Sequence, residues 1–441
     1  MPRKIVIMGA AGKDFHVFYT CYRDQPEFKV VAFTATQIPH IGGRVFPATL
    51  AGRLYPTGIP IRPEEDLEQL VRTHGVDEVV FAYSDVSFDH IAERERSARR
   101  AGASFSLFDV DRTMLASRKP IIAVTAVRTG CGKSQTTRYI LKLLKRRGVK
   151  TVAVRHPMPY GDLVRQRCQR FAEVADLARQ ECTIEEMEEY EPIINAGFVV
   201  YAGIDYGEIL AKAEQEADVI LWDGGNNDTP FFKPDLWLVV ADPLRPGHEL
   251  RYFPGKVNFS RADAVIINKM DRAAAKDVEV ILGNLKRHNP DARVVKCESE
   301  INVEDPQLIR GKRVLVVEDG PTLTHGNMKY GAGVVAAERL GAAALIDPRP
   351  YVVGEMAATF ANYPEIGTLL PAMGYGDQQV RDLEETIRKV PADTVVIATP
   401  IDLRRLVSIR QPTVRVRYEL KEIGGDRLEE LIGSAITVAK P

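Results

Sequence analysis

The sequence predicts an α/β protein built on parallel β-sheets, and three observations lead to this fold class. Short apolar runs alternate with amphipathic helical stretches, two of these runs lead into glycine turns, and a polar stretch ending at Pro120 separates two sets of runs. Strands that are apolar throughout are covered on both faces, which is typical of parallel strands joined by crossover helices. The expected strands are residues 4–8, 30–33, 78–82, 104–108, 121–127, 151–154, 219–222, 236–241, 264–268, 314–317 and 395–398.

The composition narrows the class of protein further. The 441 residues are 45% hydrophobic and 27% charged with a net charge of -1, so the chain as a whole has no attraction to nucleic acid or anionic lipid. No segment approaches the roughly 20 apolar residues of a membrane helix. The five cysteines lack a Cys-x-x-Cys pair, so neither a disulfide framework nor a zinc site is expected. We therefore expect a cytoplasmic protein with no nucleic-acid or membrane partner.

Breaks between successive sets of predicted strands and helices divide the chain into three segments. Residues 1–117 form a complete set of strands and helices, which indicates a Rossmann-like domain. Residues 118–311 begin a second set, predicted to be a doubly wound parallel-sheet nucleotidase domain. Residues 312–441 continue the α/β pattern and are either a separate carboxy-terminal part or the far half of the second sheet.

The first glycine turn, at Gly9 and Gly12, has only two glycines of a dinucleotide-binding turn. The second strand also ends without the acidic residue that binds a ribose, so we expect no redox dinucleotide there. The turn either serves structure or binds another anion with help from Lys13, Arg44 and Arg53.

The second turn is the strongest functional signal. A strand over 121–127 leads into a turn that ends in Gly-Lys-Ser and then into a helix over 135–147, an arrangement that points backbone N–H groups and the helix dipole at one spot. Lys133 would neutralise nucleotide phosphates, and the Ser134 hydroxyl would bind Mg²⁺. The predicted nucleotide-binding stretch is Thr129, Gly130, Cys131, Gly132, Lys133, Ser134 and Gln135.

The turn departs from the plain phosphate-loop pattern, because Val127 occupies the position of its first glycine. It resembles instead the deviant loop of nucleotidases related to dethiobiotin synthetase and MinD, in which a basic residue precedes the glycine turn. Arg128 has that place and is predicted to be catalytic together with Lys133.

A carboxylate follows the strand over 219–222 and would lie on the phosphate side of the sheet. Asp223 is the candidate for a second Mg²⁺ contact and for a catalytic role. Asn226 and Asn227 follow it and are candidates for substrate contacts. The alternative is that this Asp-Gly-Gly sequence only forms a turn.

The strand over 264–268 delivers Asn268, Lys269 and Asp271 in the order Asn-Lys-x-Asp. This order resembles the base-reading motif of GTPases, in which the carboxylate accepts hydrogen bonds from guanine, whereas adenine offers no matching donor. These residues are predicted to bind the nucleotide, and the chemistry of Asp271 favours guanine. The alternative is that Asp271 caps the next helix.

Two further loops are candidates for substrate binding. Arg155 and His156 follow the strand over 151–154 and should line the ligand crevice. Thr324, His325 and Lys329 lie in a glycine-rich loop after the strand over 314–317, which has the features of an anion cradle. We expect cations to gather at these loops and the acidic stretch over 181–191 to lie elsewhere.

Together the motifs Arg-Thr-Gly-Cys-Gly-Lys-Ser, Trp-Asp-Gly-Gly-Asn-Asn-Asp and Glu-Asp-Gly-Pro-Thr-Leu-Thr-His-Gly resemble the cyclic 2,3-diphosphoglycerate synthetase family over essentially the whole chain. The resemblance implies ATP- and Mg²⁺-dependent closure of 2,3-diphosphoglycerate into a cyclic pyrophosphate, with ADP and phosphate as products. Bacterial relatives of that family are labelled GTPases, so a GTPase of regulatory or chaperone type is the alternative function. Nucleotidases of this type are commonly dimers, which predicts a homodimer.

Overall fold

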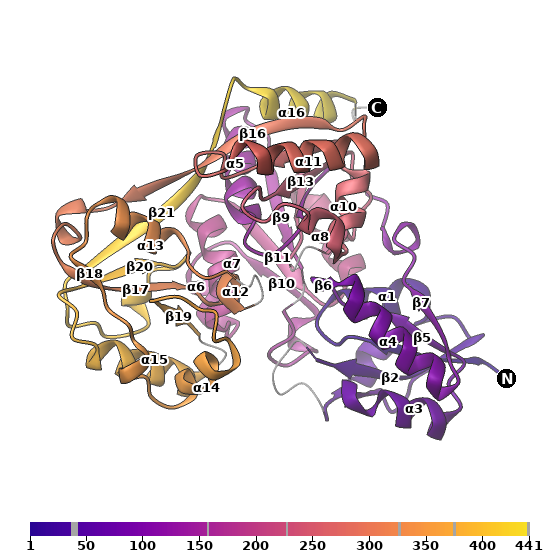
Figure 1. Cartoon of the computed structure of the whole chain (residues 1–441). Coiled ribbons are helices and arrows are strands. Elements are labelled where there is room, and N and C mark those ends of the chain that lie inside the picture. The colour runs from indigo at the N-terminus through magenta and orange to yellow at the C-terminus, as the bar shows by residue number, and fades with distance from the viewer. Residues whose placement is uncertain (37–42, 157, 226–227, 325–327, 374–375, 439–441) are drawn as a thin grey trace.

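The computed structural model describes residues 1–36, 43–156, 158–225, 228–324, 328–373 and 376–438 (Figure 1). It contains two large, mainly parallel sheets with helices packed on them, which confirms the α/β class. Three clusters of buried apolar side chains lie in the amino-terminal domain, in the central part and in the carboxy-terminal lobe. In the described part of the chain, no helix is both long and apolar enough to span a bilayer.

The amino-terminal domain is a six-stranded sheet with the strand order β3-β4-β2-β1-β5-β7, parallel except for the β3–β4 pair. Its strands are β1 (Arg3–Met8), β2 (Phe28–Ala35), β3 (Val45–Phe46), β4 (Ile59–Pro63), β5 (Glu78–Phe81) and β7 (Ser104–Leu107). Its helices are α1 (Lys13–Cys21), α2 (Ala48–Ala51), α3 (Leu67–His74) and α4 (Phe88–Ala101).

The central part of the molecule carries the second glycine turn on a parallel sheet with the order β11-β9-β12-β8-β13-β15-β16. The strands are β8 (Ile121–Ala126), β9 (Thr151–Arg155), β10 (Cys168–Phe171), β11 (Val199–Gly203), β12 (Val219–Asp223), β13 (Leu236–Ala241), β15 (Ala264–Ile267) and β16 (Arg293–Val303), of which β10 is antiparallel to β11. The helices are α5 (Lys133–Arg146), α6 (Ala175–Arg179), α7 (Ile184–Asn195), α8 (Tyr206–Glu216), α9 (His248–Arg251), α10 (Gly255–Arg261) and α11 (Ala275–His288).

The carboxy-terminal lobe continues the central sheet. Its strands are β17 (Arg313–Asp319), β18 (Ala344–Leu345), β19 (Leu370–Ala372), β20 (Thr394–Ala398) and β21 (Thr413–Glu422). Its helices are α12 (Gly320–Thr324), α13 (Ala332–Arg339), α14 (Glu355–Asn362), α15 (Asp377–Lys389) and α16 (Arg427–Val438). Strand β21 pairs antiparallel with β16 and parallel with β20, so one ladder runs from β10 to β18.

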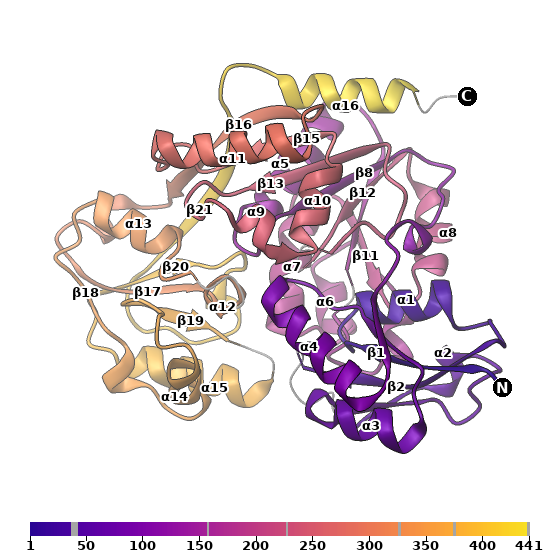
Figure 2. The ribbon, with the colours of Figure 1, turned by 45° about the vertical axis from the view of Figure 1, so that its right-hand side comes forward.

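The amino-terminal domain packs against the central part on the side opposite α16, as both views show (Figures 1 and 2). Strand β6 (Val86–Ser87) pairs antiparallel with β14 (Tyr252–Phe253). The ring of His16 stacks on that of Phe231 with centroids 4.1 Å apart. These contacts bring the segment after β5 next to the turn that follows β8.

Candidate functional site

The phosphate loop lies at the carboxyl end of β8, between the neighbouring strands β12 and β13. Gly130 and Gly132 have φ values of 81° and 105°, and α5 begins directly after them at Lys133. A Cβ atom at Gly132 would lie 2.1 Å from Nδ2 of Asn268. The positive φ and this close approach together require glycine at position 132.

The Asn-Lys pair after β15 donates hydrogen bonds to the backbone of the phosphate loop. Nδ2 of Asn268 donates to the Cys131 carbonyl oxygen at 2.9 Å, and Nζ of Lys269 donates to that of Gly130 at 2.7 Å. Lys269 also pairs with Asp242 at 2.8 Å. In this structure Asn268 and Lys269 contact the nucleotide loop itself, so any contact with a base would be additional.

The third member of the motif has other partners. Oδ1 of Asp271 accepts a hydrogen bond from the backbone N–H of Ser299 at 3.2 Å, and Oδ2 lies 3.4 Å from Arg339 and 3.5 Å from Arg272. The carboxylate does not cap the next helix, because Ala274 is the N-cap residue of α11. Guanine recognition by Asp271 stays a prediction, and it would require these ion pairs to open.

A cluster of four charges stands beside the loop, with Arg155 and Asp223 buried at its centre and Glu189 31% exposed at its edge. Nζ of Lys133 lies 2.6 Å from Oδ1 of Asp223, and the guanidinium of Arg155 lies 2.7 Å from Oδ2 of Asp223 and also pairs with Glu189. Burial alone would raise the pKa of Asp223, but the Arg155 and Lys133 charges outweigh it and hold this pKa below its ordinary value. Burial, with the nearby Arg155 charge, lowers the pKa of Lys133.

The charged cluster determines which protein oxygens are available at the predicted Mg²⁺ site. The described residues contain no group of three or more His, Cys, Asp or Glu side chains arranged to hold a metal ion. A nucleotide-bound Mg²⁺ keeps most of its water and phosphate ligands and needs only one or two protein oxygens. Ser134 lines the cavity at the start of α5 and fits that role. Both oxygens of Asp223 are engaged by cations, so Asp223 would contact the ion only after Lys133 turned toward phosphate.

The predicted catalytic Arg128 has a protein partner that the sequence did not indicate. Its Nε lies 3.0 Å from Oδ1 of Asp85, and its guanidinium stacks on the ring of Tyr252 at 3.7 Å. Oδ2 of Asp85 accepts a hydrogen bond from Thr129 at 2.7 Å. Asp85 belongs to the amino-terminal domain and has a φ of 62°, an uncommon value for aspartate. The amino-terminal domain therefore contacts the phosphate loop directly, and the charge of Arg128 is already balanced.

His156 lies beside the charged cluster, as its position after β9 predicts. It is buried, and its Nδ1 lies 3.9 Å from Oδ2 of Asp228. Burial and the Arg155 charge hold the pKa of His156 well below its ordinary value, so the ring is neutral. The predicted substrate residues Asn226 and Asn227 are outside the described residues.

Two of the three candidate side chains of the predicted anion cradle after β17 have partners within the protein. Thr324 is buried and donates to the Gly320 carbonyl oxygen at 3.1 Å within α12. Lys329 is 67% exposed and pairs with Glu365 at 3.0 Å. Both side chains thus have protein partners in this structure, and substrate binding by either of them stays a prediction. His325 is outside the described residues.

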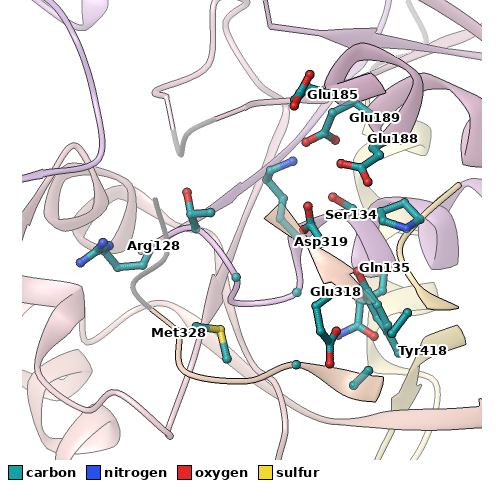
Figure 3. Close-up of a pocket in the computed structure, with 18 of the residues that line it drawn as sticks. Arg128, Ser134, Gln135, Glu185, Glu188, Glu189, Glu318, Asp319, Met328 and Tyr418 are labelled. Carbon is teal, nitrogen blue, oxygen red and sulfur yellow. The ribbon is translucent and has the colours of Figure 1, made fainter. Parts of the chain in front are cut away.

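Carboxylates line the cavity opposite the phosphate loop (Figure 3). They come from one face of α7 and from the end of β17, and we call them the acidic wall: Glu185, Glu188, Glu189, Glu318 and Asp319. The expectation that the acidic stretch over 181–191 lies away from the site is therefore wrong. Residues at spacings of three and four share one face of a helix, which places the glutamates of α7 together.

Burial perturbs two members of the acidic wall. It raises the pKa of Glu318 to about 8, although the carboxylate accepts N–H groups of Gly333 at 2.8 Å and Val334 at 3.1 Å at the start of α13. Burial and the neighbouring Asp319 raise the pKa of Glu188 well above its usual range. Perturbed carboxyls in a cleft next to a phosphate loop mark a candidate site of catalysis.

The first glycine turn is closed by its own chain. The carboxylate of Asp14 accepts N–H groups of Ala11, Gly12 and Phe15 at 2.8–3.1 Å. A Cβ atom at Gly9 would lie 2.4 Å from Asp14. Lys13, one of the three predicted helpers of an anion, is 3% exposed and lies over the ring of Phe231. The turn serves structure, since a carboxylate takes the place that an anionic ligand would need.

The parallel sheet, the glycine turn and the helix that begins at Lys133 define the chain as a phosphate-loop α/β protein. The arginine synthetase ArcE of Thermococcus kodakarensis is 58% identical over 430 residues, which cover 98% of this chain and 96% of that protein. The chain belongs to the family of this arginine synthetase. No protein-family model matches it.

Two solved structures are similar in part. LpxK of Aquifex aeolicus, in complex with ATP, has a TM-score of 0.45 at 14% identity and matches 73% of this chain and 90% of its own. The hydrogenase maturation factor HypB of Archaeoglobus fulgidus has a TM-score of 0.24 at 18% identity and matches 48% of this chain and 89% of its own.

Proposed function

We propose that this protein is a nucleotide-dependent ligase that forms arginine. The observation that carries the proposal is the acidic wall facing the phosphate loop across one cavity. Arginine is a cation at its side chain, and carboxylates are the partners that guanidinium and ammonium groups prefer. The name of the relative, arginine synthetase, supports the same product.

The chemistry of such a ligase follows from its product. A guanidinium carbon bonded to three nitrogens forms when the oxygen of a ureido group is replaced by nitrogen, so the substrate is the ureido counterpart of arginine, citrulline. Transfer of the γ-phosphoryl group to the ureido oxygen breaks the phosphoanhydride bond, releases ADP and converts that oxygen into a leaving group. Attack by ammonia then forms the C–N bond, and the C–O bond breaks with release of phosphate.

The residues of the loop have clear tasks in this scheme. Backbone N–H groups from Thr129 to Lys133 bind phosphates, and Lys133 leaves Asp223 to neutralise the transferred phosphoryl group. Arg155 remains fixed between Asp223 and Glu189 and holds the carboxylates in place. Mg²⁺, with Ser134 as its protein ligand, would supply charge neutralisation on the phosphates.

Cyclisation of 2,3-diphosphoglycerate is the second candidate, favoured by the loop motifs of the sequence. Its substrate carries several negative charges and needs an excess of cations in the cavity. The cations near the loop are paired with carboxylates: Lys133 with Asp223, Arg155 with Asp223 and Glu189, and Arg128 with Asp85. The charge balance of the cavity therefore favours a cationic product over a polyanionic one.

The test is a product assay with the purified full chain and MgCl₂. The chain is incubated with ATP or GTP and either citrulline plus ammonium or 2,3-diphosphoglycerate, and arginine, ADP or GDP, and phosphate are quantified. We expect arginine, nucleoside diphosphate and phosphate in equal amounts, loss of all three in Lys133→Ala, and no effect of Lys286→Ala, which removes an exposed lysine of α11 outside the cavity. A cyclic pyrophosphate signal in phosphorus NMR, with no arginine, would establish the second candidate instead.

A further inference from the structure

Two neighbouring members of the acidic wall, one from α7 and one from the end of β17, form a pair at the cavity. The carboxyl groups of Glu188 and Asp319 are close enough to interact, and both line the cavity (Figure 3). A hydrogen bond between two carboxyl groups needs one proton between them, because two carboxylates have only acceptors. Sharing one proton would leave the pair with one negative charge.

One atom of the pair is buried without a partner. Glu188 is 5% exposed, and its Oε1 has no hydrogen-bond partner among the described residues. A buried carboxyl oxygen that lacks a donor is costly, so its retention at a cavity wall indicates a donor that comes with a ligand. Glu188 lines the same cavity as Lys133 and Ser134 of the phosphate loop.

Other members of the wall already have protein partners. Glu189 pairs with Arg155, and Glu318 accepts the N–H groups of Gly333 and Val334 at the start of α13. The Glu188–Asp319 pair thus differs from Glu189 and Glu318 in retaining a carboxyl oxygen without a hydrogen-bond donor.

We infer that Glu188 and Asp319 bind the ammonium ion that is consumed in the arginine-forming reaction and take the proton it must lose before it can attack. This inference rests on the proposed function. Ammonium has no lone pair, so a base has to accept one proton to give ammonia. The lone pair of ammonia then forms the C–N bond, and a second proton leaves with the departing phosphate as hydrogen phosphate.

The same pair would contact the product. The delivered nitrogen becomes an NH₂ group of the guanidinium, which donates hydrogen bonds to carboxylates in a forked geometry. The affinity for arginine is therefore a measure of the pair that does not depend on turnover.

The experiment compares Glu188→Gln with the wild type and with the control Glu279→Gln, which changes an exposed glutamate on α11. Ammonium and hydroxylamine are used as alternative nucleophiles, because hydroxylamine is already neutral at neutral pH and needs no base. We expect kcat/KM for ammonium to fall about 100-fold or more in Glu188→Gln, the usual range for loss of a general base, and kcat/KM for hydroxylamine to fall less than about tenfold. The KM for nucleotide should not change.

Calorimetric titration of L-arginine in the presence of ADP gives the second readout, and Asp319→Asn is the second variant. We expect each substitution to weaken arginine binding at least tenfold, about 1.4 kcal/mol. Equal losses with both nucleophiles, or arginine affinity and ammonium kinetics like those of the wild type, would overturn the inference while arginine formation by the wild type still stands. A wild type that neither forms nor binds arginine would overturn the proposed function and the inference with it.

Discussion

Removal of one charge from the four-charge cluster beside the phosphate loop should destabilise the central sheet strongly. The cluster contains the cations of Lys133 and Arg155 and the carboxylates of Asp223 and Glu189, so it is neutral as a whole. Asp223→Asn leaves two cations with one carboxylate at a site where the side chains of Arg155 and Asp223 are each 1% exposed. Loss of one partner of a buried pair costs about 3–5 kcal/mol, and because Asp223 serves two cations we expect the upper end of this range.

The assay is urea unfolding followed by tryptophan fluorescence. Both tryptophans of the chain lie in the central sheet: Trp222 on β12, directly before Asp223, and Trp237 on β13. The control Asp218→Asn changes an exposed carboxylate just before the same strand and should cost less than about 1.5 kcal/mol, the value of one hydrogen bond.

A double variant tests whether the four charges act as one neutral unit. Asp223→Asn combined with Arg155→Met leaves one cation, Lys133, and one carboxylate, Glu189, so neutrality is restored. We expect the double variant to be more stable than the sum of the single effects by about 2 kcal/mol, within the usual range for residues in contact. Additive effects, or a loss below about 1 kcal/mol in Asp223→Asn, would show that the four charges do not act as one neutral unit.

Three further predictions concern the loop and the acidic wall. Asp85→Asn should raise the KM for nucleotide about fivefold, because one charge-assisted partner of the loop is worth roughly 1 kcal/mol, and an unchanged KM would contradict this role. Gly132→Ala should abolish measurable nucleotide binding in calorimetry, since its Cβ would overlap Asn268; retained binding would mean that the loop can open there. The raised pKa of Glu318, about 8 against 4.5, means that the folded state keeps a proton that the unfolded state releases, so the contribution of Glu318 to stability is complete below about pH 4.5 and is lost as the pH rises to about 8. Glu318→Gln should flatten that decrease in urea titrations at several pH values.

The sequence predicts the strands of the parallel sheet well and those at its far side poorly. All eleven apolar runs correspond to strands, and except in edge strand β7 these runs are largely buried, which produces continuous apolar stretches that can be recognised locally. Other strands escape the same search, among them the buried strand β11 and also β16 and β21, whose sequences alternate buried and exposed residues, as in Arg293–Val303. Alternation is the pattern of a half-exposed antiparallel pair, and this pair joins the carboxy-terminal lobe to the central sheet.

The sequence likewise predicts one part of the candidate site and not the other. The phosphate loop is encoded within seven residues, so its position follows from the sequence, whereas the close approach of Gly132 to Asn268 depends on the fold. The acidic wall combines α7 with the end of β17, which are more than a hundred residues apart, and only the tertiary fold brings Glu188 to Asp319. Asp85 is likewise invisible locally, since its link to Arg128 depends on the docking of one domain on another.

The closed turn of the amino-terminal domain fixes how much nucleotide one chain can hold. With Asp14 seated among the N–H groups of its own turn, the domain has lost the feature by which a sheet of this kind binds a phosphate. A titration with ATP should therefore saturate at a stoichiometry of one nucleotide per polypeptide, although the chain contains two glycine turns between a strand and a helix.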